Sequence, residues 1–223
     1  MTGNRFRNRT QAGEMLATEL LQAGYGVGRQ DVLVLALPRG GVPVGFVVAQ
    51  VLPAPLDLLM VRKLAAPGQP EWAIGAIASG GGRVLNLNAV RALGLTDSEI
   101  EAIAQREAFE LERRELAYRA GCAATEVIGK TVLLVDDGLA TGTTMRAAVR
   151  VLRRRQPARL VVAVPVAAAE TCRELRQEAD DVICCCTPQP FLSVGEWFDD
   201  FSQITDEEVR ALWQRAAVGR KTG

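Results

Sequence analysis

The chain alternates between short apolar runs and longer stretches in which apolar positions recur at helical spacing. Apolar runs with the length of buried strands fall at residues 32–37, 56–61, 132–135, 160–166 and 181–186. Helical patterns fall at residues 10–21, 42–51, 97–118 and 143–155. A further helical pattern follows the apolar run at 160–166 and ends at about residue 179, and the last one begins at about residue 206. This alternation predicts an α/β fold with a central, mainly parallel sheet flanked by helices.

Three segments depart from the alternation. Residues 72–79 and 84–88 flank a run of glycines and predict a hairpin. Thr96 and Glu99 have the spacing of a capping box that opens a long charged helix. Residues 188–201 are aromatic and irregular. Because no Pro/Gly/Ser linker divides the chain, we expect one domain over residues 1–223, with a core at about 30–187 and a C-terminal hood or tail at about 188–223.

Charge and hydropathy narrow the range of partners. Lys plus Arg equals Asp plus Glu, at 26 each, so no global field attracts nucleic acid or an anionic membrane. The longest apolar run, residues 160–169, is far shorter than the roughly 20 residues of a membrane span. No apolar stretch follows the charged N-terminus, so we expect no signal peptide and a cytoplasmic location.

The chain contains no histidine, which excludes Ser-His and Cys-His catalysis and histidine-bound metals. Its cysteines are Cys122, Cys172, Cys184, Cys185 and Cys186. Three consecutive strand residues cannot converge on one metal, so we interpret this run as buried thiols rather than a zinc site or a disulfide framework. Chemistry must therefore depend on carboxylates, Arg, Lys, hydroxyls, backbone amides or a metal that arrives with a ligand.

One stretch, VLLVDDGLATGTTM at residues 132–145, carries the strongest functional signal. An apolar strand ends in the carboxylate pair, Asp136 and Asp137, and a small-residue loop leads into a helix near Thr143. Open α/β sheets bind ligands at this end of their strands, and a helix N-terminus favours phosphate. The stretch has neither the Gly-Lys-Ser/Thr of a P-loop nor the glycines of a dinucleotide fingerprint.

Two carboxylates would repel a bare phosphate, yet they suit a sugar diol or a bound Mg²⁺. A five-carbon sugar with a 5-phosphate meets both demands. The alternative is that Asp136 and Asp137 only end a strand and cap a turn.

VLLVDDGLATGTT resembles the phosphoribosyl-diphosphate (PRPP) motif of the type I phosphoribosyltransferase family. The resemblance covers roughly residues 30–205. ALPRGGVPVG and DLLMVRKLAAPGQPEWAIGAIASGG resemble a bacterial subgroup whose acceptor is undefined. The resemblance implies PRPP as donor, Mg²⁺ as cofactor, a small-molecule acceptor and a homodimer.

The resemblance also implies residue roles. Asp136 and Asp137 would hold the ribose 2- and 3-hydroxyls and help seat Mg²⁺. The 5-phosphate would lie in the phosphate loop, which comprises Ala140, Thr141, Gly142, Thr143 and Thr144.

Residues 38–41, the Arg-Gly-Gly loop, would hold pyrophosphate through Arg39, Gly40 and Gly41. The glycines allow amides to point at an anion, and a guanidinium fork matches phosphate oxygens. We expect a cis peptide between Pro38 and Arg39, as relatives often have one. Arg62 and Lys63 are expected to end a strand on the same sheet edge, where Lys63 would give a second cationic contact. A solvated charge pair is the alternative.

The tail, QPFLSVGEWFDDF, resembles the hood of 6-oxopurine relatives. Phe191 would then stack on the base and Asp200 would contact the base or metal. Alternatively, Trp197, Phe198 and Phe201 form a small hydrophobic lid. In 6-oxopurine relatives an aspartate precedes the Thr-Gly of the phosphate loop, but Ala140 stands there in this chain.

We therefore expect a phosphoribosyltransferase that transfers the 5-phosphoribosyl group from PRPP to a nitrogenous base or related acceptor and releases pyrophosphate. One alternative is a PRPP-binding regulatory protein with little or no turnover. Another is a hydrolase or phosphorylase of a ribosyl phosphate, which would share the pocket.

Overall fold

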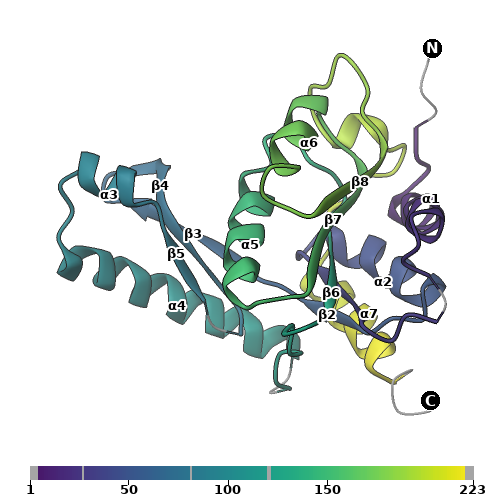
Figure 1. Cartoon of the computed structure of the whole chain (residues 1–223), viewed down its shortest axis with the longest axis horizontal. Coiled ribbons are helices and arrows are strands. Elements are labelled where there is room, and N and C mark those ends of the chain that lie inside the picture. The colour runs from purple at the N-terminus through teal and green to yellow at the C-terminus, as the bar shows by residue number, and fades with distance from the viewer. Residues whose placement is uncertain (1–4, 27, 81, 120–121, 219–223) are drawn as a thin grey trace.

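The computed structural model describes residues 5–26, 28–80, 82–119 and 122–218, without the side chains of residues 70, 71, 217 and 218. The ends of the predicted domain, residues 1–4 and 219–223, lie outside the described residues. The central sheet is parallel, with strand order β2-β1-β6-β7-β8 (Figure 1). Its strands are β1 (Val32–Ala36), β2 (Leu56–Leu58), β6 (Thr131–Val135), β7 (Arg159–Val166) and β8 (Asp181–Cys186). The predicted α/β fold class is confirmed.

Helices cover both faces of this sheet (Figure 1). One face carries α1 (Arg9–Gln22), α2 (Gly41–Val51) and α7 (Asp206–Val218), and the other carries α5 (Thr143–Arg154) and α6 (Ala169–Leu175). Strand β1 alternates between two cores, with Val34 in the first and Leu33 and Leu35 in the second. Because both faces are buried, the strands are apolar at nearly every position. None of the helices that the structure describes is both long and apolar enough to cross a membrane.

A second, antiparallel sheet projects beside the parallel one (Figure 1). It consists of β3 (Val61–Ala66), β4 (Gln69–Ala78) and β5 (Arg83–Leu85), and it packs with α3 (Leu87–Ala92) and α4 (Asp97–Arg119). The predicted hairpin is confirmed by the pairing of Ala76 with Val84. Its second strand ends earlier than predicted, because the Asn86 side chain accepts a hydrogen bond from the Ala89 amide and so caps α3.

The prediction of one strand over residues 56–61 is wrong. The chain leaves the parallel sheet after Leu58 and begins the antiparallel sheet at Val61. Ser79 fixes this change of sheet, since its hydroxyl accepts from the Met60 amide at 3.0 Å and its own amide donates to the Met60 carbonyl at 2.9 Å. Arg62 and Lys63 therefore do not end a strand of the parallel sheet. They lie inside β3, opposite residues of β4.

Helix α4 begins as the sequence predicts and ends in a buried ion pair. The capping box is present, with the Glu99 carboxylate accepting from the Thr96 amide at 2.8 Å. At the other end, Arg119 Nη1 lies 2.6 Å from Asp57 Oδ1, and both side chains are 2% exposed. Trp213 Nε1 donates to the same carboxylate oxygen at 3.2 Å. This network ties α4 to β2 and α7. Helix α6 ends at Leu175, short of the predicted 179.

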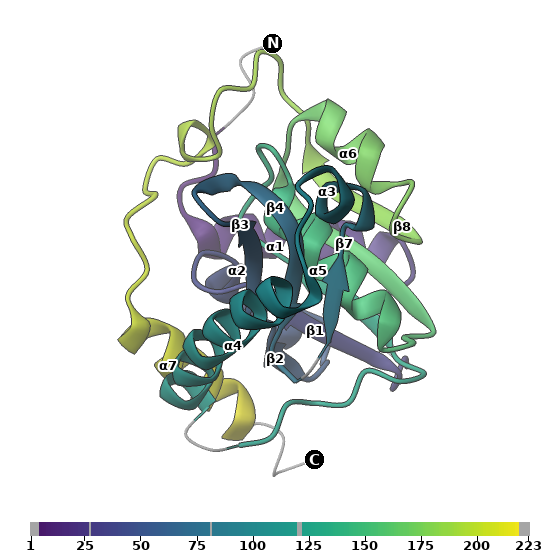
Figure 2. The same ribbon diagram turned by 90° about the vertical axis from the view of Figure 1, so that its left-hand side faces the viewer.

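The tail at residues 188–202 is irregular apart from a 3-10 turn at Gly195–Trp197. Figure 2 shows it descending along one side of the molecule to α7. It pairs with the N-terminal segment, because Phe6 and Phe198 form a parallel bridge and their rings lie 5.3 Å apart. Both rings are buried, and Trp197 and Phe201 pack against them. These aromatic residues form the hydrophobic cluster that the alternative interpretation of the tail describes, and the cluster packs on the N-terminal segment.

Candidate functional site

The carboxylate pair lies directly after β6, at the carboxyl end of the parallel sheet. The Asp137 amide donates to Oδ1 of Asp136 at 2.9 Å. The Arg-Gly-Gly loop packs against the pair so closely that a Cβ atom on Gly40 would overlap Oδ2 of Asp137. A Cβ atom on Gly41 would lie 2.7 Å from the Val135 carbonyl oxygen. Glycine at both positions is therefore what allows this loop to lie beside the carboxylates.

Burial raises the pKa of Asp136 well above its usual range, and the negative charge of Asp137 raises it further. Burial likewise raises the pKa of Asp137, although Arg9 acts in the opposite direction. Two carboxylates this close disfavour full ionisation of the pair. A ligand that brings positive charge or hydrogen-bond donors to them would favour their charged forms, as a metal ion or a sugar diol does.

Arg9 is the site residue that the sequence did not predict. Its Nε atom donates to Oδ2 of Asp137 at 2.8 Å, and Nη1 donates to the Ser202 carbonyl at 2.8 Å. The guanidinium also lies 3.9 Å from the centre of the Phe201 ring. Asn8 places Arg9 here, because its side chain caps the start of α1. Only this capping residue was visible in the sequence.

The phosphate loop forms the start of α5, as the sequence predicts. Gly142 has a φ of +65°, which favours glycine, and α5 begins at Thr143. A Cβ atom on Gly142 would lie 2.5 Å from the Thr171 methyl group. The Thr171 hydroxyl donates to the Ala140 carbonyl at 2.5 Å and so ties the loop to α6.

The hydroxyl-bearing residues of this loop are open to solvent. Thr141, Thr143 and Thr144 are exposed, and the Thr141 and Thr143 hydroxyl oxygens lie 3.1 Å apart. The helix has 12 residues, so its first amides and its dipole offer a site for an anion.

Arg39 faces away from the carboxylate pair. The peptide between Pro38 and Arg39 is cis, as predicted. The Arg39 side chain extends toward α7, where Nη1 lies 3.8 Å from Oδ1 of Asp206. Among the residues that the structure describes, the amides of Arg39 and Gly40 donate to no acceptor. The loop thus offers free amides beside the carboxylates, while its guanidinium lies on the other side.

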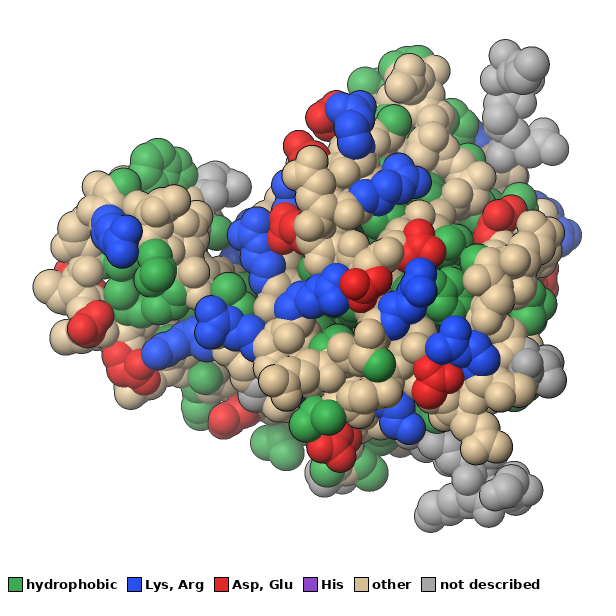
Figure 3. Space-filling view, in the orientation of Figure 1, with side chains coloured by type: hydrophobic (Ala, Val, Ile, Leu, Met, Phe, Trp, Pro, Cys, Tyr) green, Lys and Arg blue, Asp and Glu red, His purple; other side chains and the backbone are tan. Residues whose placement is uncertain are grey.

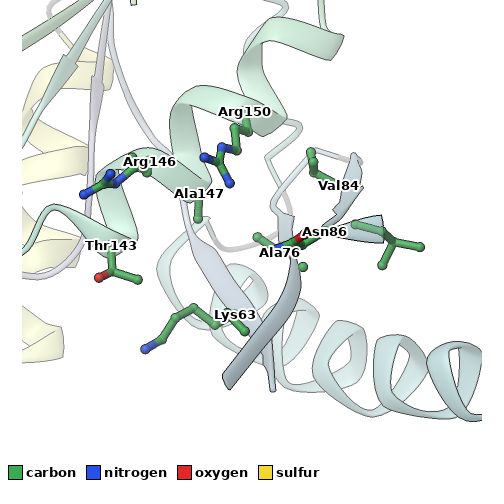
Figure 4. Close-up of a pocket in the computed structure, with 11 residues that line it drawn as sticks. Lys63, Ala76, Val84, Asn86, Thr143, Arg146, Ala147 and Arg150 are labelled. Carbon is green, nitrogen blue, oxygen red and sulfur yellow. The ribbon is translucent and has the colours of Figure 1, made fainter. Parts of the chain in front are cut away.

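Lys63 reaches the site from the antiparallel sheet rather than from the parallel one. It lines a pocket of about 320 Å³ between β3 and α5, together with Thr143, Arg146 and Arg150 (Figure 4). The two arginines are ion-paired to α6 and the residues after it, through Glu174 and Glu178. Figure 3 shows such blue and red side chains next to one another over α5 and α6. Lys63 forms no ion pair with any residue that the structure describes, so it supplies positive charge near the phosphate loop.

The two predicted acceptor residues have different surroundings. Phe191 is half-buried and packs on the aromatic cluster around Phe198. Asp200 is exposed, and its carboxylate accepts from the Ser202 amide at 3.0 Å. It lines a pocket of about 610 Å³ that it shares with Arg9. Their roles in acceptor binding stay predictions.

Few residues are available to hold a metal. In the described part of the chain no three or more Cys, Asp and Glu side chains gather as a metal site. The carboxylate pair supplies oxygen ligands, which suit Mg²⁺. Two carboxylates are too few for a complete site, so the remaining ligands would have to come from substrate or water.

Comparison with known proteins places this geometry in a family. The family model for the phosphoribosyl transferase domain matches residues 6–202. The chain therefore belongs to the phosphoribosyl transferase domain family.

Individual relatives agree with this assignment. The proteins named "Putative phosphoribosyl transferase" from two Mycobacterium tuberculosis strains, CDC 1551 / Oshkosh and ATCC 25618 / H37Rv, are 42% identical over 211 residues. That match covers 95% of this chain and 47% of each relative, so the chain spans about half their length. The crystal structure of TT1426 from Thermus thermophilus is 42% identical, with a TM-score of 0.85, covering 95% of this chain and 98% of that one.

Proposed function

We propose that this protein transfers the 5-phosphoribosyl group from PRPP to a nitrogenous base or related acceptor, releases pyrophosphate, and requires Mg²⁺. One observation carries the proposal. The carboxylate pair packs against the Arg-Gly-Gly loop and its free amides, and from the pair the chain continues through the phosphate loop to the open N-terminus of α5. This arrangement suits a ribose that carries an anionic group at each end.

The donor would bind in a single orientation. Thr141, Thr143 and the first amides of α5 suit the 5-phosphate. Asp136 and Asp137 suit the ribose diol, because ionised carboxylates accept hydrogen bonds from two hydroxyls. The pyrophosphate end would then meet the amides of the Arg-Gly-Gly loop. Mg²⁺, when bound, would neutralise pyrophosphate charge, held jointly by the carboxylates and the donor.

Transfer breaks the bond between ribose C1 and pyrophosphate and forms a bond from C1 to the acceptor nitrogen. Positive charge develops on the sugar and negative charge on the leaving group. The carboxylate pair favours the first, and the free amides of the Arg-Gly-Gly loop favour the second. Because Lys63 lines a pocket with Thr143 of the phosphate loop, its contact with pyrophosphate stays a prediction. Catalysis of this kind depends on position and electrostatics. It needs no histidine, and the chain has none.

The test is turnover with a panel of bases. The wild-type protein would be incubated with Mg²⁺, PRPP and each base in turn, with pyrophosphate release measured and the nucleotide identified by mass. We expect one base to give a nucleotide in step with pyrophosphate. PRPP binding without any product would instead favour the regulatory alternative, and ribosyl phosphate hydrolysis would favour a hydrolase. The homodimer also stays a prediction.

A further inference from the structure

A second cavity lies on the opposite side of the Arg-Gly-Gly loop from the carboxylate pair. It has a volume of about 280 Å³, and its walls come from this loop, β3, α4 and the start of α7. Among the described residues, four arginines line it and Asp206 is its one carboxylate; the arginines are Arg39, Arg62, Arg113 and Arg114. We name this cavity the arginine pocket.

Two of these arginines form ion pairs with carboxylates of α4, of which the Arg113 pair is exposed to solvent, and two do not. Arg62 Nε donates to Oε2 of Glu107 at 2.6 Å, and Arg113 Nη2 donates to Oε2 of Glu110 at 3.1 Å. Arg114 has no ion pair with any residue in the described ranges. Arg39 lies 3.8 Å from Asp206, which is beyond hydrogen-bond distance. The pocket therefore keeps excess positive charge in a chain of zero net charge.

Tyr118 shows that the unneutralised arginines lie around one point. Its hydroxyl donates to Oδ1 of Asp206 at 2.6 Å. Burial and Asp206 raise the pKa of Tyr118 to about 12, and the charges of Arg39 and Arg114 act in the opposite direction. Both guanidinium groups are thus close enough to the phenol to influence it. Since Tyr118 holds Asp206, that carboxylate is only partly available to neutralise Arg39.

The arrangement differs from ordinary solvated arginines on a helix surface. The lining residues come from segments that are far apart in sequence, at residues 38–39, 60–62, 111–118 and 206. The volume of about 280 Å³ is just below the roughly 300–1,000 Å³ typical of ligand pockets, so the cavity suits a small anion better than a whole nucleotide. A guanidinium fork pairs with phosphate oxygens in a bidentate manner.

We propose that the arginine pocket is a binding site for a small phosphate-bearing anion, held by Arg39, Arg113 and Arg114, and distinct from the carboxylate pair. Gly40 faces Asp137 on one side of the loop, while the Arg39 side chain faces this pocket on the other. An anion here would replace Asp206 as the partner of Arg39. The pyrophosphate end of PRPP and a free anion offer the same chemistry, and the experiment distinguishes them.

The probe is inorganic pyrophosphate, titrated calorimetrically into the full chain. Arg113→Ala with Arg114→Ala should weaken its binding about tenfold or more, because hydrogen bonds to charged groups are the strong ones. The matched control is Arg154→Ala with Arg173→Ala. Arg173 is paired to Glu170 on its own helix as Arg113 is to Glu110, and exposed Arg154 has no ion pair with a described residue. Thermal melts establish that both variants fold.

A third variant, Asp136→Asn with Asp137→Asn, separates the two sites. It should keep pyrophosphate binding while losing PRPP binding. Pyrophosphate that stays bound in the presence of saturating PRPP would identify a second anion site and support the proposal. Displacement of pyrophosphate by PRPP would identify the anion as the pyrophosphate end of the donor and would overturn the proposal of a distinct site.

Two further results would overturn the proposal. The first is pyrophosphate binding by the Arg113→Ala, Arg114→Ala variant equal to that of its control. The second is no pyrophosphate binding by the wild-type protein, or binding that the carboxylate variant abolishes. Failure of the proposed function would look different, because pyrophosphate would still bind while PRPP gave neither binding nor transfer.

Discussion

Arg9 donates a hydrogen bond from Nε to Oδ2 of Asp137 at 2.8 Å, across 128 residues of sequence. The Arg9 side chain is 9% exposed and that of Asp137 is 14% exposed. The same guanidinium lies on the Phe201 ring and donates to the Ser202 carbonyl. The N-terminal helix and the tail therefore meet at the carboxylate pair, and Arg9 fixes both the orientation and the charge of Asp137.

Arg9→Ala should shift PRPP binding to higher pH. The substitution leaves Asp137 buried beside Asp136 but removes the positive charge of Arg9, which lowers the pKa of Asp137. The pKa of Asp137 should therefore rise further. Because the ribose role needs an ionised carboxylate, affinity near pH 7 should fall about 10- to 100-fold. The measurement is the dissociation constant of Mg²⁺–PRPP from pH 5.5 to 8.5.

Two variants control this test. Arg7→Ala removes an exposed arginine from the same segment and should leave the pH profile unchanged. Arg9→Lys keeps the positive charge but lacks the guanidinium fork, so its PRPP affinity near pH 7 should lie between that of wild type and that of Arg9→Ala. Superimposable pH profiles for wild type and Arg9→Ala would show that Arg9 has only a structural role.

Asp136→Asn should stabilise the ligand-free protein at pH 7 to 8. The raised pKa means that the folded state binds this proton more tightly than the unfolded state, so the charged carboxylate lowers stability as pH rises through that pKa. Each unit of pKa shift corresponds to about 1.4 kcal/mol. The gain in unfolding free energy of Asp136→Asn over wild type should shrink as pH falls, because Asp136 of the wild-type protein then becomes neutral.

Urea unfolding between pH 5 and pH 8 measures this gain. Asp137→Asn provides the comparison. It also removes a negative charge, but it leaves Arg9 without its ion-pair partner, so its gain in stability should be smaller. An Asp136→Asn protein less stable than wild type at pH 8 would contradict the repulsion between the two carboxylates.

Arg119→Met should cost about 3–5 kcal/mol at pH 7, because it leaves Asp57 buried without its positive partner. Burial raises the pKa of Asp57, but Arg119 and the Thr125 amide more than offset this and hold it below its usual value. Ionised Asp57 therefore contributes stability above the unfolded-state pKa, and this is lost as pH falls through the lowered folded pKa.

The pH dependence identifies the cause. In Arg119→Met, Asp57 should take up a proton at higher pH than in wild type, so the deficit should narrow as the solution is acidified. Arg83→Met is the control, since Arg83 and Glu101 form an exposed ion pair that solvent screens, so its loss should cost much less stability. The measurement is the free energy of denaturant unfolding. Equal losses for Arg119→Met and Arg83→Met would show that the ion pair between Arg119 and Asp57 does not stabilise the fold.

Ala140 predicts weak activity with hypoxanthine, guanine and xanthine, despite the tail that resembles 6-oxopurine relatives. An alanine side chain can neither give nor take the proton at N7 of the base, and no histidine can replace it. Loss of a positioned general base forfeits about 10²- to 10⁴-fold. Ala140→Asp should raise inosine or guanosine monophosphate formation. Rapid formation of either nucleotide by the wild-type protein would refute this interpretation.

The sequence predicts the parts of the site that are local in the chain. The strand β6, the pair Asp136 and Asp137, and the start of α5 at Thr143 follow one another within a dozen residues, so pattern and capping rules suffice. The Arg-Gly-Gly loop was predicted in the same way. Its place against Asp137 depends on the pairing of β1 with β6, and the α/β alternation predicts a parallel sheet without fixing this strand order.

Contacts between distant segments were not predictable. Nothing near Arg9 in the sequence indicates a bond to Asp137, because that contact needs the folded N-terminal helix. The apolar run at residues 56–61 reads as one strand, since hydrophobicity does not mark the point at which the chain changes sheets. That error placed Lys63 on the wrong sheet, although it still lines a pocket with Thr143.

PRPP recognition by the carboxylate pair is the central claim, and thermal unfolding in the presence of ligand tests it most directly. The wild-type protein would be melted alone, with Mg²⁺, and with Mg²⁺ plus PRPP, beside Asp136→Asn with Asp137→Asn. At about 100 times its dissociation constant, PRPP should stabilise wild type by about 2.7 kcal/mol and so raise the Tm. The double variant should fold but lose most of that rise. No rise for wild type, or an equal rise for both proteins, would contradict the account.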